Sequence, residues 1–456
     1  MRYAVKVALT VALGGFLMGF DASVISGVVT FIEPELGLSK LELGWTVASL
    51  TLTATLAMML SGPLSDRLGR RPVLKIAAVL FAVSAIASAV APGFVTLAAA
   101  RMLGGFGVGA ALIIAPMYIA EIAPAAMRGR MVSFNQLNIV IGISVAFFSN
   151  YLILRLGESE LPWAEALRLG EWNWRWMLGV EALPAIVYFF ALFAVPESPR
   201  WLLMHAQEDE ARRVLERVSN RDQAEKEIEA VKASLRAEEG TERAAPRELL
   251  QPALRWVLVI GISIAILQQV TGINAVFFYA PMIFEQSGIG TDASFMQAVL
   301  VGLVNLVFTV LAISFIDRIG RRPLLVAGLA GIAVCMLLLS YGFASEDTNP
   351  MLILAGILGF VASFAMSLGP VMWVLFSELF PNRVRGLAIS FVGLINSAVS
   401  FTVQLVFPWE LETLGNSITF LIYGLFALAG LVLVIRLFPE TKGRSLEELE
   451  GELLAR

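Results

Sequence analysis

The sequence predicts an all-α membrane protein with twelve transmembrane helices, arranged as two parallel-repeat six-helix bundles with short intracellular helices. Three observations predict this fold: a large apolar fraction, a series of apolar runs of membrane-spanning length, and motifs that occur once in each half of the chain. Of the 456 residues, 58% are apolar and 15% are charged. Soluble domains average about 25% charged residues, so the composition excludes a water-soluble globule.

The apolar runs come close to the length of about 20 residues that a bilayer-spanning helix needs. The first run continues to Ile32 without a small-residue cleavage site, so we expect a retained span and not a signal peptide. The predicted spans cover roughly residues 5–31, 42–64, 73–91, 95–119, 131–154, 175–195, 255–284, 294–316, 323–344, 351–379, 386–409 and 416–438.

Basic residues are concentrated in alternate loops between these spans. Three loops on the other side, around residues 285–292, 346–347 and 410–412, contain acids and no Lys or Arg. By the positive-inside rule, both termini are expected in the cytoplasm. The short tails favour a bacterial cytoplasmic (inner) membrane.

The two halves of the chain share their motifs. The motif 'DRLGRRP' at 66–72 returns as 'DRIGRRP' at 317–323, and the Glu-x-x-Pro motif at 121–124 returns at 378–381. Each pair follows the same span number in its half, which indicates a parallel repeat. We therefore predict an amino-terminal bundle over 1–196, an intracellular helical linker over 197–252, a carboxyl-terminal bundle over 253–438 and a cytoplasmic tail over 439–456.

Asp21 stands in the middle of the first predicted span, roughly 24 Å along a helix that begins near Val5. An acid at this depth is unfavourable unless it faces a partner or a wet cavity, so it indicates an ion or proton site. Arg101 in the fourth span is the only other charge that we expect at depth in that half, and it is the natural partner. The alternative is a structural ion pair that never opens.

Amide side chains form the second candidate site, together with one indole. Amides both donate and accept hydrogen bonds, which suits hydroxyl groups, and an indole offers an apolar wall. Amides can instead link membrane helices to one another. Three of the amides, at 268, 269 and 274, do not share one helix face, so a break near Gly272 is expected. The candidates are Gln136, Gln268, Gln269, Asn274, Asn305, Trp373 and Asn396.

Charges at the predicted cytoplasmic ends of the spans also repeat between the halves. Basic residues alone would satisfy membrane orientation, whereas their repetition with matched acids favours ion pairs that open and close a gate. The candidates are Asp66, Arg70, Glu121, Arg128, Glu197, Asp317, Arg321, Glu378, Arg385 and Glu440.

Several function classes are not supported. The chain has one cysteine and one histidine, so we expect neither a Cys/His metal site nor a His-containing catalytic triad. No phosphate-binding loop is present, and carboxylates other than Asp21 are expected at the membrane edges. The formal net charge is -4 and no basic face is evident, so nucleic-acid binding is not expected. We predict no enzyme activity and no cofactor.

The chain resembles the sugar porter family of the major facilitator superfamily over essentially its whole length. The resemblance rests on motifs of the first span, the loops after the second and eighth spans, the end of the sixth span, the seventh span and the carboxyl end. These motifs are 'GFDASVISG', 'DRLGRRP' with 'DRIGRRP', 'PESPRWLL', 'QQVTGINAVFFYAP' and 'PETKGRSLEEL'.

The resemblance implies alternating access, four intracellular helices in the linker, and a sugar held mainly by the carboxyl half. It implies that the amides named above contact the sugar and that Trp373 stacks on it. Asp21 matches the acid of proton-coupled members and Arg101 its partner, which favours proton symport. Ile143 stands where some pentose porters carry Gln, which favours a hexose such as glucose over xylose.

The resemblance leaves a facilitative uniporter, with Asp21 in a fixed ion pair, as the main alternative. A transporter-shaped sugar sensor and an exporter of apolar compounds are further alternatives, although buried amides would stay unsatisfied by an apolar ligand. The expected partners are a monosaccharide, the proton and the lipid bilayer, and we expect a monomer.

Overall fold

The computed structural model describes residues 2–124, 127–219, 221–239, 246–345, 348–381, 384–438 and 440. Every regular element in these ranges is helical, and twelve helical stretches are long and apolar enough to cross a membrane. The predicted all-α fold with twelve spans is confirmed. Most predicted spans agree with the helices to within a few residues.

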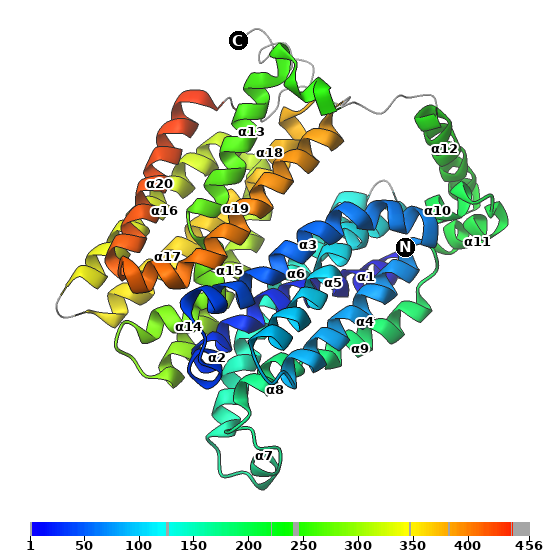
Figure 1. Cartoon of the computed structure of the whole chain (residues 1–456). Coiled ribbons are helices and arrows are strands. Elements are labelled where there is room, and N and C mark those ends of the chain that lie inside the picture. Colours follow the sequence, from blue (N-terminus) through cyan, green and yellow to red (C-terminus); the bar gives the residue numbers. More distant parts are fainter. Residues whose placement is uncertain are drawn as a thin grey trace. The chain divides into compact units, whose positions relative to one another are not determined.

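The first six spans come from the amino-terminal part of the chain (Figure 1). Their helices, with α2 and α7 beside them, are α1 (Arg2–Val24), η1 (Ile25–Gly27), α2 (Val29–Leu36), α3 (Lys40–Leu68), α4 (Arg70–Ala89), α5 (Phe94–Ile122), α6 (Arg128–Gly157), α7 (Pro162–Ala166), α8 (Asn173–Gly179), α9 (Ala182–Ala191) and η3 (Leu192–Ala194). The sixth span is interrupted between α8 and α9.

The last six spans repeat this plan, with interruptions in the seventh and tenth spans. Their helices are α13 (Pro252–Val270), α14 (Ile273–Glu285), α15 (Thr291–Ile319), α16 (Arg321–Ala344), α17 (Pro350–Met366), α18 (Leu368–Leu379), α19 (Arg385–Thr413) and α20 (Asn416–Leu437). In both halves the spans joined by the 'DRxGRRP' motif meet at a single glycine.

The polar stretch between the halves contains three α-helices and one short 3-10 helix in its described part. They are α10 (Pro199–Met204), α11 (Glu208–Val218), α12 (Arg221–Glu239) and η4 (Pro246–Leu250). Ser198 caps α10 by accepting a hydrogen bond from the backbone N–H of Trp201. The apolar face of α11 is buried and its opposite face carries acids and bases, as expected for helices at an aqueous surface.

The chain divides into two compact units. The first consists of Met1–Ile25, Ser49–Ser149 and Leu156–Arg243, and the second of Ser26–Ala48, Asn150–Arg155 and Ala244–Arg456. Within the first unit, α4 packs against α5 and α9, and α1 packs against α5. Within the second, α16 packs against α17 and α20, and α13 packs against α19. The predicted domain boundaries at residues 196, 252 and 438 stay a prediction.

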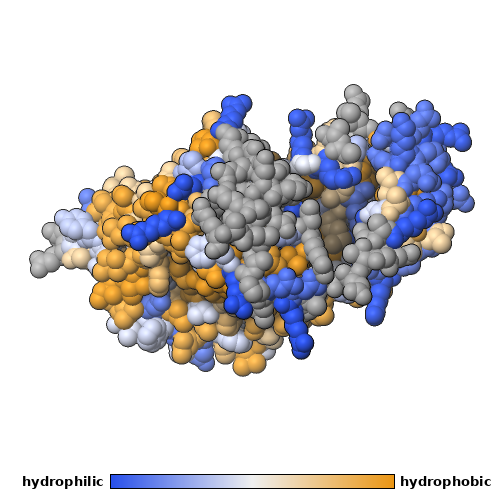
Figure 2. Space-filling view, turned by 90° about the horizontal axis from the view of Figure 1, so that it is seen from above, coloured by the Kyte–Doolittle hydropathy of each residue, from blue (hydrophilic) through white to orange (hydrophobic). Residues whose placement is uncertain are grey.

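Large apolar side chains cover much of the surface of the spanning helices. Leu60 and Phe190 in the first unit and Val334 in the second are each more than 60% exposed. Figure 2 shows extensive apolar surface, and hydrophilic side chains gather where α11 and α12 lie, at the right of the view. Such apolar exposure is expected where the solvent is lipid. The chain is a multi-pass membrane protein.

Candidate functional site

Asp21 of α1 and Arg101 of α5 form an ion pair inside the first unit. Asp21 is 0% exposed and Arg101 is 2% exposed. Both terminal nitrogens of Arg101 also donate to the backbone carbonyl of Asp21, each at 3.2 Å. The structure thus brings together the two residues that the sequence paired.

The second carboxylate oxygen of Asp21 lies in a small space next to Gly104. Asp21 Oδ2 is buried and has no hydrogen-bond partner among the described residues. It faces Gly104 and Ser84, because a Cβ added at Gly104 would lie 2.7 Å from Oδ2 and 2.6 Å from the Ser84 hydroxyl. The glycine therefore makes room for the carboxylate, and Oδ2 is the atom that can accept a proton.

Glu181 is a buried carboxylate that the sequence analysis missed. It stands at the interruption between α8 and α9, is 2% exposed and lies close enough for the charges of Asp21 and Arg101 to act on it. The expectations that Arg101 is the only other deep charge of this half, and that all other carboxylates lie at membrane edges, are wrong. The interrupted helix and long-range packing place Glu181 beside the pair.

Four of the predicted amides form one hydrogen-bonded chain inside the second unit. Asn396 donates to Gln268 Oε1 at 2.8 Å, and Gln269 donates to Asn396 Oδ1 at 3.2 Å. Asn274 then donates to Gln269 Oε1 at 2.8 Å and to Ser400 Oγ at 2.7 Å. We call these residues, with Ser400 and Gln404, the amide chain. The two glutamines and Asn396 are each at most 7% exposed.

The predicted break in the seventh span is present at Gly272. This residue has φ +89° and separates α13 from α14. Glycine adopts this left-handed conformation without a steric penalty, whereas other L-residues do so with strain. The break turns Asn274 toward Gln269, which a straight helix would not allow for residues five apart.

Ser400 and Gln404 extend the amide chain beyond the residues predicted from sequence. The amide of Gln404 donates to Ser400 Oγ at 2.8 Å, and its backbone carbonyl accepts a hydrogen bond from Tyr279 at 3.0 Å. Both side chains follow Asn396 at steps of four residues, so they share its face of α19. That spacing is the signal that could have identified them.

Three predicted contacts lie outside the amide chain. Asn305 is buried on α15, with 6% exposure. Trp373 of α18 is 51% exposed and packs edge-to-face on Phe376. Gln136 is exposed on α6 in the first unit.

A charge network lies at the junction of α3 and α4. Arg70 donates two hydrogen bonds to Glu121, at 2.9 and 3.0 Å, and one to Asp66 at 2.8 Å. Glu197 accepts hydrogen bonds from the backbone N–H groups of Arg70 and Arg71. We call Asp66, Arg70, Glu121 and Glu197 the first charge network. Burial raises the pKa of Glu197, although the backbone hydrogen bonds and Arg71 oppose this shift.

The second charge network repeats this arrangement at the junction of α15 and α16. Arg321 donates two hydrogen bonds to Glu378, at 2.6 and 3.1 Å. Glu440 accepts the backbone N–H groups of Arg321 and Arg322, at 3.0 and 3.1 Å. Arg321, Glu378 and Glu440 make up this network, and the side chain of Asp317 lies outside the described residues.

The remaining two predicted gate residues stand apart from these pairs. Arg128 is exposed at the start of α6. Arg385 begins α19 and donates from Nε to the carbonyl of Phe380 at 3.1 Å.

Comparisons with known proteins agree with this architecture. The family described as 'Sugar (and other) transporter' matches residues 7–453. The arabinose-proton symporter of Bacillus subtilis is 37% identical, over 99% of this chain and 95% of its own length. A glucose transporter of Staphylococcus epidermidis is 35% identical, over 98% of this chain and 96% of its own.

A solved structure is similar over the whole chain. The xylose transporter of E. coli, in an inward-open conformation, has 35% sequence identity and a TM-score of 0.85, and the match covers 99% of this chain and all of that one. Family, relatives and fold agree with the motifs found in the sequence. This chain therefore belongs to the sugar porter family of the major facilitator superfamily, whose members named here are transporters and not enzymes.

Proposed function

We propose that the chain carries a monosaccharide across the membrane together with a proton, by alternating access. The observation that carries this proposal is the buried Asp21–Arg101 pair with its open carboxylate oxygen. Relatives named as proton symporters of arabinose and of xylose support it. The proton is the coupling ion, and no cofactor is required.

The proton step uses the geometry of the pair. A proton taken up at Asp21 Oδ2 converts the carboxylate to a neutral acid and removes most of its attraction for Arg101. Glu181 is buried beside the pair, so the guanidinium keeps a second carboxylate to which it can turn. A pair that can open in this way acts as a switch, whereas a fixed structural pair does not.

The sugar step uses the amide chain. Without a ligand, its amides satisfy one another. A sugar hydroxyl both donates and accepts, so it can replace a bond between two amides without leaving either group unsatisfied. We assign Gln268, Gln269, Asn274 and Asn396 to the sugar on this ground, and Gln136, Asn305 and Trp373 as further contacts on the resemblance.

The two charge networks supply the cytoplasmic gate. Bidentate Arg–Glu pairs hold the ends of the spans in one geometry, and their separation would let these ends move apart. We assign to this gate the residues of both networks, with Arg128, Asp317 and Arg385. The basic ends of the spans then face the cytoplasm, with both termini, in the inner membrane of a bacterium. We propose that the monomer is the transporting unit.

Coupling requires that the proton favours the sugar-bound state over the empty one, since a ligand with equal affinity for all states shifts no equilibrium. For the sugar, Ile143 favours a hexose such as glucose. Relatives named for arabinose, glucose and xylose define the panel to test.

The test is uptake of labelled glucose, xylose and arabinose into proteoliposomes, with and without an inward proton gradient. We expect accumulation above equilibrium only with the gradient. Asp21→Asn should abolish accumulation and keep sugar exchange between the two sides, whereas the control Asp209→Asn, in α11, should behave as wild type. Accumulation that survives in Asp21→Asn would exclude this proton site. Gradient-independent equilibration in the wild type would indicate a uniporter, and binding without flux would indicate a sensor.

A further inference from the structure

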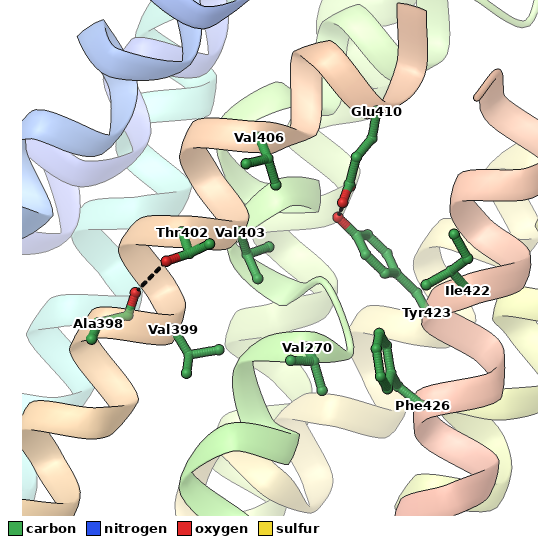
Figure 3. Close-up of a pocket in the computed structure, with 10 residues that line it drawn as sticks. All are labelled: Val270, Ala398, Val399, Thr402, Val403, Val406, Glu410, Ile422, Tyr423 and Phe426. Carbon is green, nitrogen blue, oxygen red and sulfur yellow. Dashed lines mark hydrogen bonds between the residues drawn. The ribbon is translucent and has the colours of Figure 1, made fainter. Parts of the chain in front are cut away.

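A groove lies between α19 and α20 in the second unit, with Val270 of α13 behind it (Figure 3). Its volume is about 320 Å³. Its α19 wall consists of residues at steps of four, which share one helix face. The wall residues are Ala398, Val399, Thr402, Val403, Val406 and Glu410 on α19, and Ile422, Tyr423 and Phe426 on α20.

The groove opens toward the lipid. Ala398 and Thr402 are exposed, and Phe426 is 44% exposed. Neighbouring apolar side chains on the same helices, such as Leu394 and Leu425, are also exposed. In a membrane-spanning chain, apolar side chains of this kind contact acyl chains.

The walls are apolar along most of the groove and polar at one end. The hydroxyl of Thr402 is satisfied internally, because it donates to the carbonyl of Ala398 at 2.9 Å. The polar end of the groove is the end at Glu410. There Tyr423 donates to Glu410 Oε2 at 2.7 Å, and the two side chains point toward one another in Figure 3. The side-chain hydrogen bond of Glu410 among the described residues is the one from Tyr423 to Oε2, so Oε1 stays available to a donor.

Glu410 lies at the carboxyl end of the α19 span, opposite to the end at Arg385. It lies in the last turn of α19, where the helix dipole adds negative potential. Residues 410–415 contain two acids and no base. A head group whose outer part carries an ammonium is therefore favoured at this end, and a head group of net negative charge is repelled.

We propose that this groove binds a bilayer phospholipid whose head group carries a primary ammonium, with one acyl chain between α19 and α20 and the ammonium on Glu410. The apolar walls fit the chain, and the carboxylate fits a head group that donates hydrogen bonds. A quaternary ammonium has the charge without the N–H donors, so it should bind less well. An occupant also touches Tyr423, whose ring lies against Gly272 and so supports the break beside the amide chain.

The test is titration of the delipidated full-length protein with phosphatidylethanolamine, phosphatidylcholine and phosphatidylglycerol of identical acyl chains, with bound lipid counted by native mass spectrometry. We expect phosphatidylethanolamine to bind about tenfold more tightly than phosphatidylglycerol, as for one charge-assisted hydrogen bond. Phosphatidylcholine should lie between them.

Glu410→Gln should remove this preference, and the matched control Glu412→Gln, two residues further along on an exposed position, should keep it. Equal affinities in the wild type, or an unchanged preference in Glu410→Gln, would overturn the proposal.

A second variant separates the groove from the head-group contact. Val399→Trp fills the groove and should abolish binding of all three lipids, whereas Val432→Trp, at an exposed position of α20, should leave binding unchanged. Unchanged lipid binding in Val399→Trp would place the lipid elsewhere and overturn the proposal. A dimer that Val399→Trp dissociates would also overturn it, in favour of a second copy of the chain as the occupant.

Discussion

The two units bury different kinds of polar chemistry in their membrane-spanning cores. The first buries the ionisable side chains of Asp21, Arg101 and Glu181, whereas the second buries neutral amides centred on Gln269 and Asn396. Charges respond to a proton, and amides respond to a ligand that exchanges hydrogen bonds. If the proposed function holds, this repeated fold divides coupling ion and substrate between its halves, although both halves keep the same charge network at one end.

The largest effect is expected where buried carboxyl groups lose Arg101, the cation that acts on them. Arg101→Ala would leave two buried carboxylates uncompensated, which costs about 3–5 kcal/mol in comparable sites. We expect a large fall in the melting temperature of the purified protein and partial recovery in the double variant with Asp21→Asn, since Glu181 stays uncompensated.

The matched control for this prediction is Arg155→Ala, because Arg155 forms an exposed pair with Asp292 at 3.5 Å. Exposed pairs contribute at most about 1 kcal/mol, so the melting temperature should change little. If the melting temperature of Arg101→Ala equalled that of Arg155→Ala, the stability of the first unit would not depend on compensating its buried charges. The contrast drawn between the two units would then be wrong.

An intermediate effect is expected from the amide chain. Gln269→Ala removes the residue that joins Asn274 to Asn396, and we expect sugar affinity to fall about tenfold, in line with the loss of one or two hydrogen bonds. Equilibrium binding of labelled sugar measures this. Gln286→Ala, on an exposed residue after α14, is the control.

The same variant distinguishes a sugar site from helix-linking amides. If the amides serve to link α13, α14 and α19, Gln269→Ala should lower the melting temperature and leave sugar affinity unchanged. That outcome would remove Gln269 from the site.

The sequence predicts the parts of this molecule that depend on composition and local pattern. Run length predicts the twelve spans, and a lone acid in an apolar run predicts the Asp21 site. The glycine between Gln269 and Asn274 predicts the break, because spacing on a regular helix excludes a shared face. These features need no knowledge of which helices touch.

The sequence does not predict what depends on packing between distant helices. Glu181 follows an interruption of its span, so its depth cannot be counted along a straight helix, and its closeness to Arg101 is a tertiary property. Ser400 and Gln404 share the face of Asn396 by their spacing, but a serine often bonds within its own helix, so the spacing alone does not show a contact with α14. Only the contacts between α14 and α19 show that they continue the amide chain.

The smallest effect concerns the charge networks, where the two units agree. Glu197 and Glu440 accept the same backbone N–H groups of their 'DRxGRRP' loops, so Glu197→Gln and Glu440→Gln should each weaken one loop by about 1 kcal/mol or less. Burial raises the pKa of Glu197 above its ordinary value of 4.5. The folded chain then binds a proton at Glu197 more readily than the unfolded chain does.

A carboxyl group whose pKa is higher in the folded chain than in the unfolded chain contributes to the free energy of unfolding at low pH. This contribution is lost as pH rises from 4.5 through the raised pKa, and above that range it no longer changes with pH. The difference in melting temperature between the wild type and Glu197→Gln should therefore decrease as pH rises across this range. Thermal unfolding of both proteins in steps between about pH 4 and 8 measures this difference. Glu210→Gln, on an exposed residue of α11, supplies the baseline for titration of surface acids. A difference that increases with pH would mean that the hydrogen bonds from Arg70, Arg71 and Ser198 outweigh burial, and that the first charge network holds Glu197 mainly as an anion.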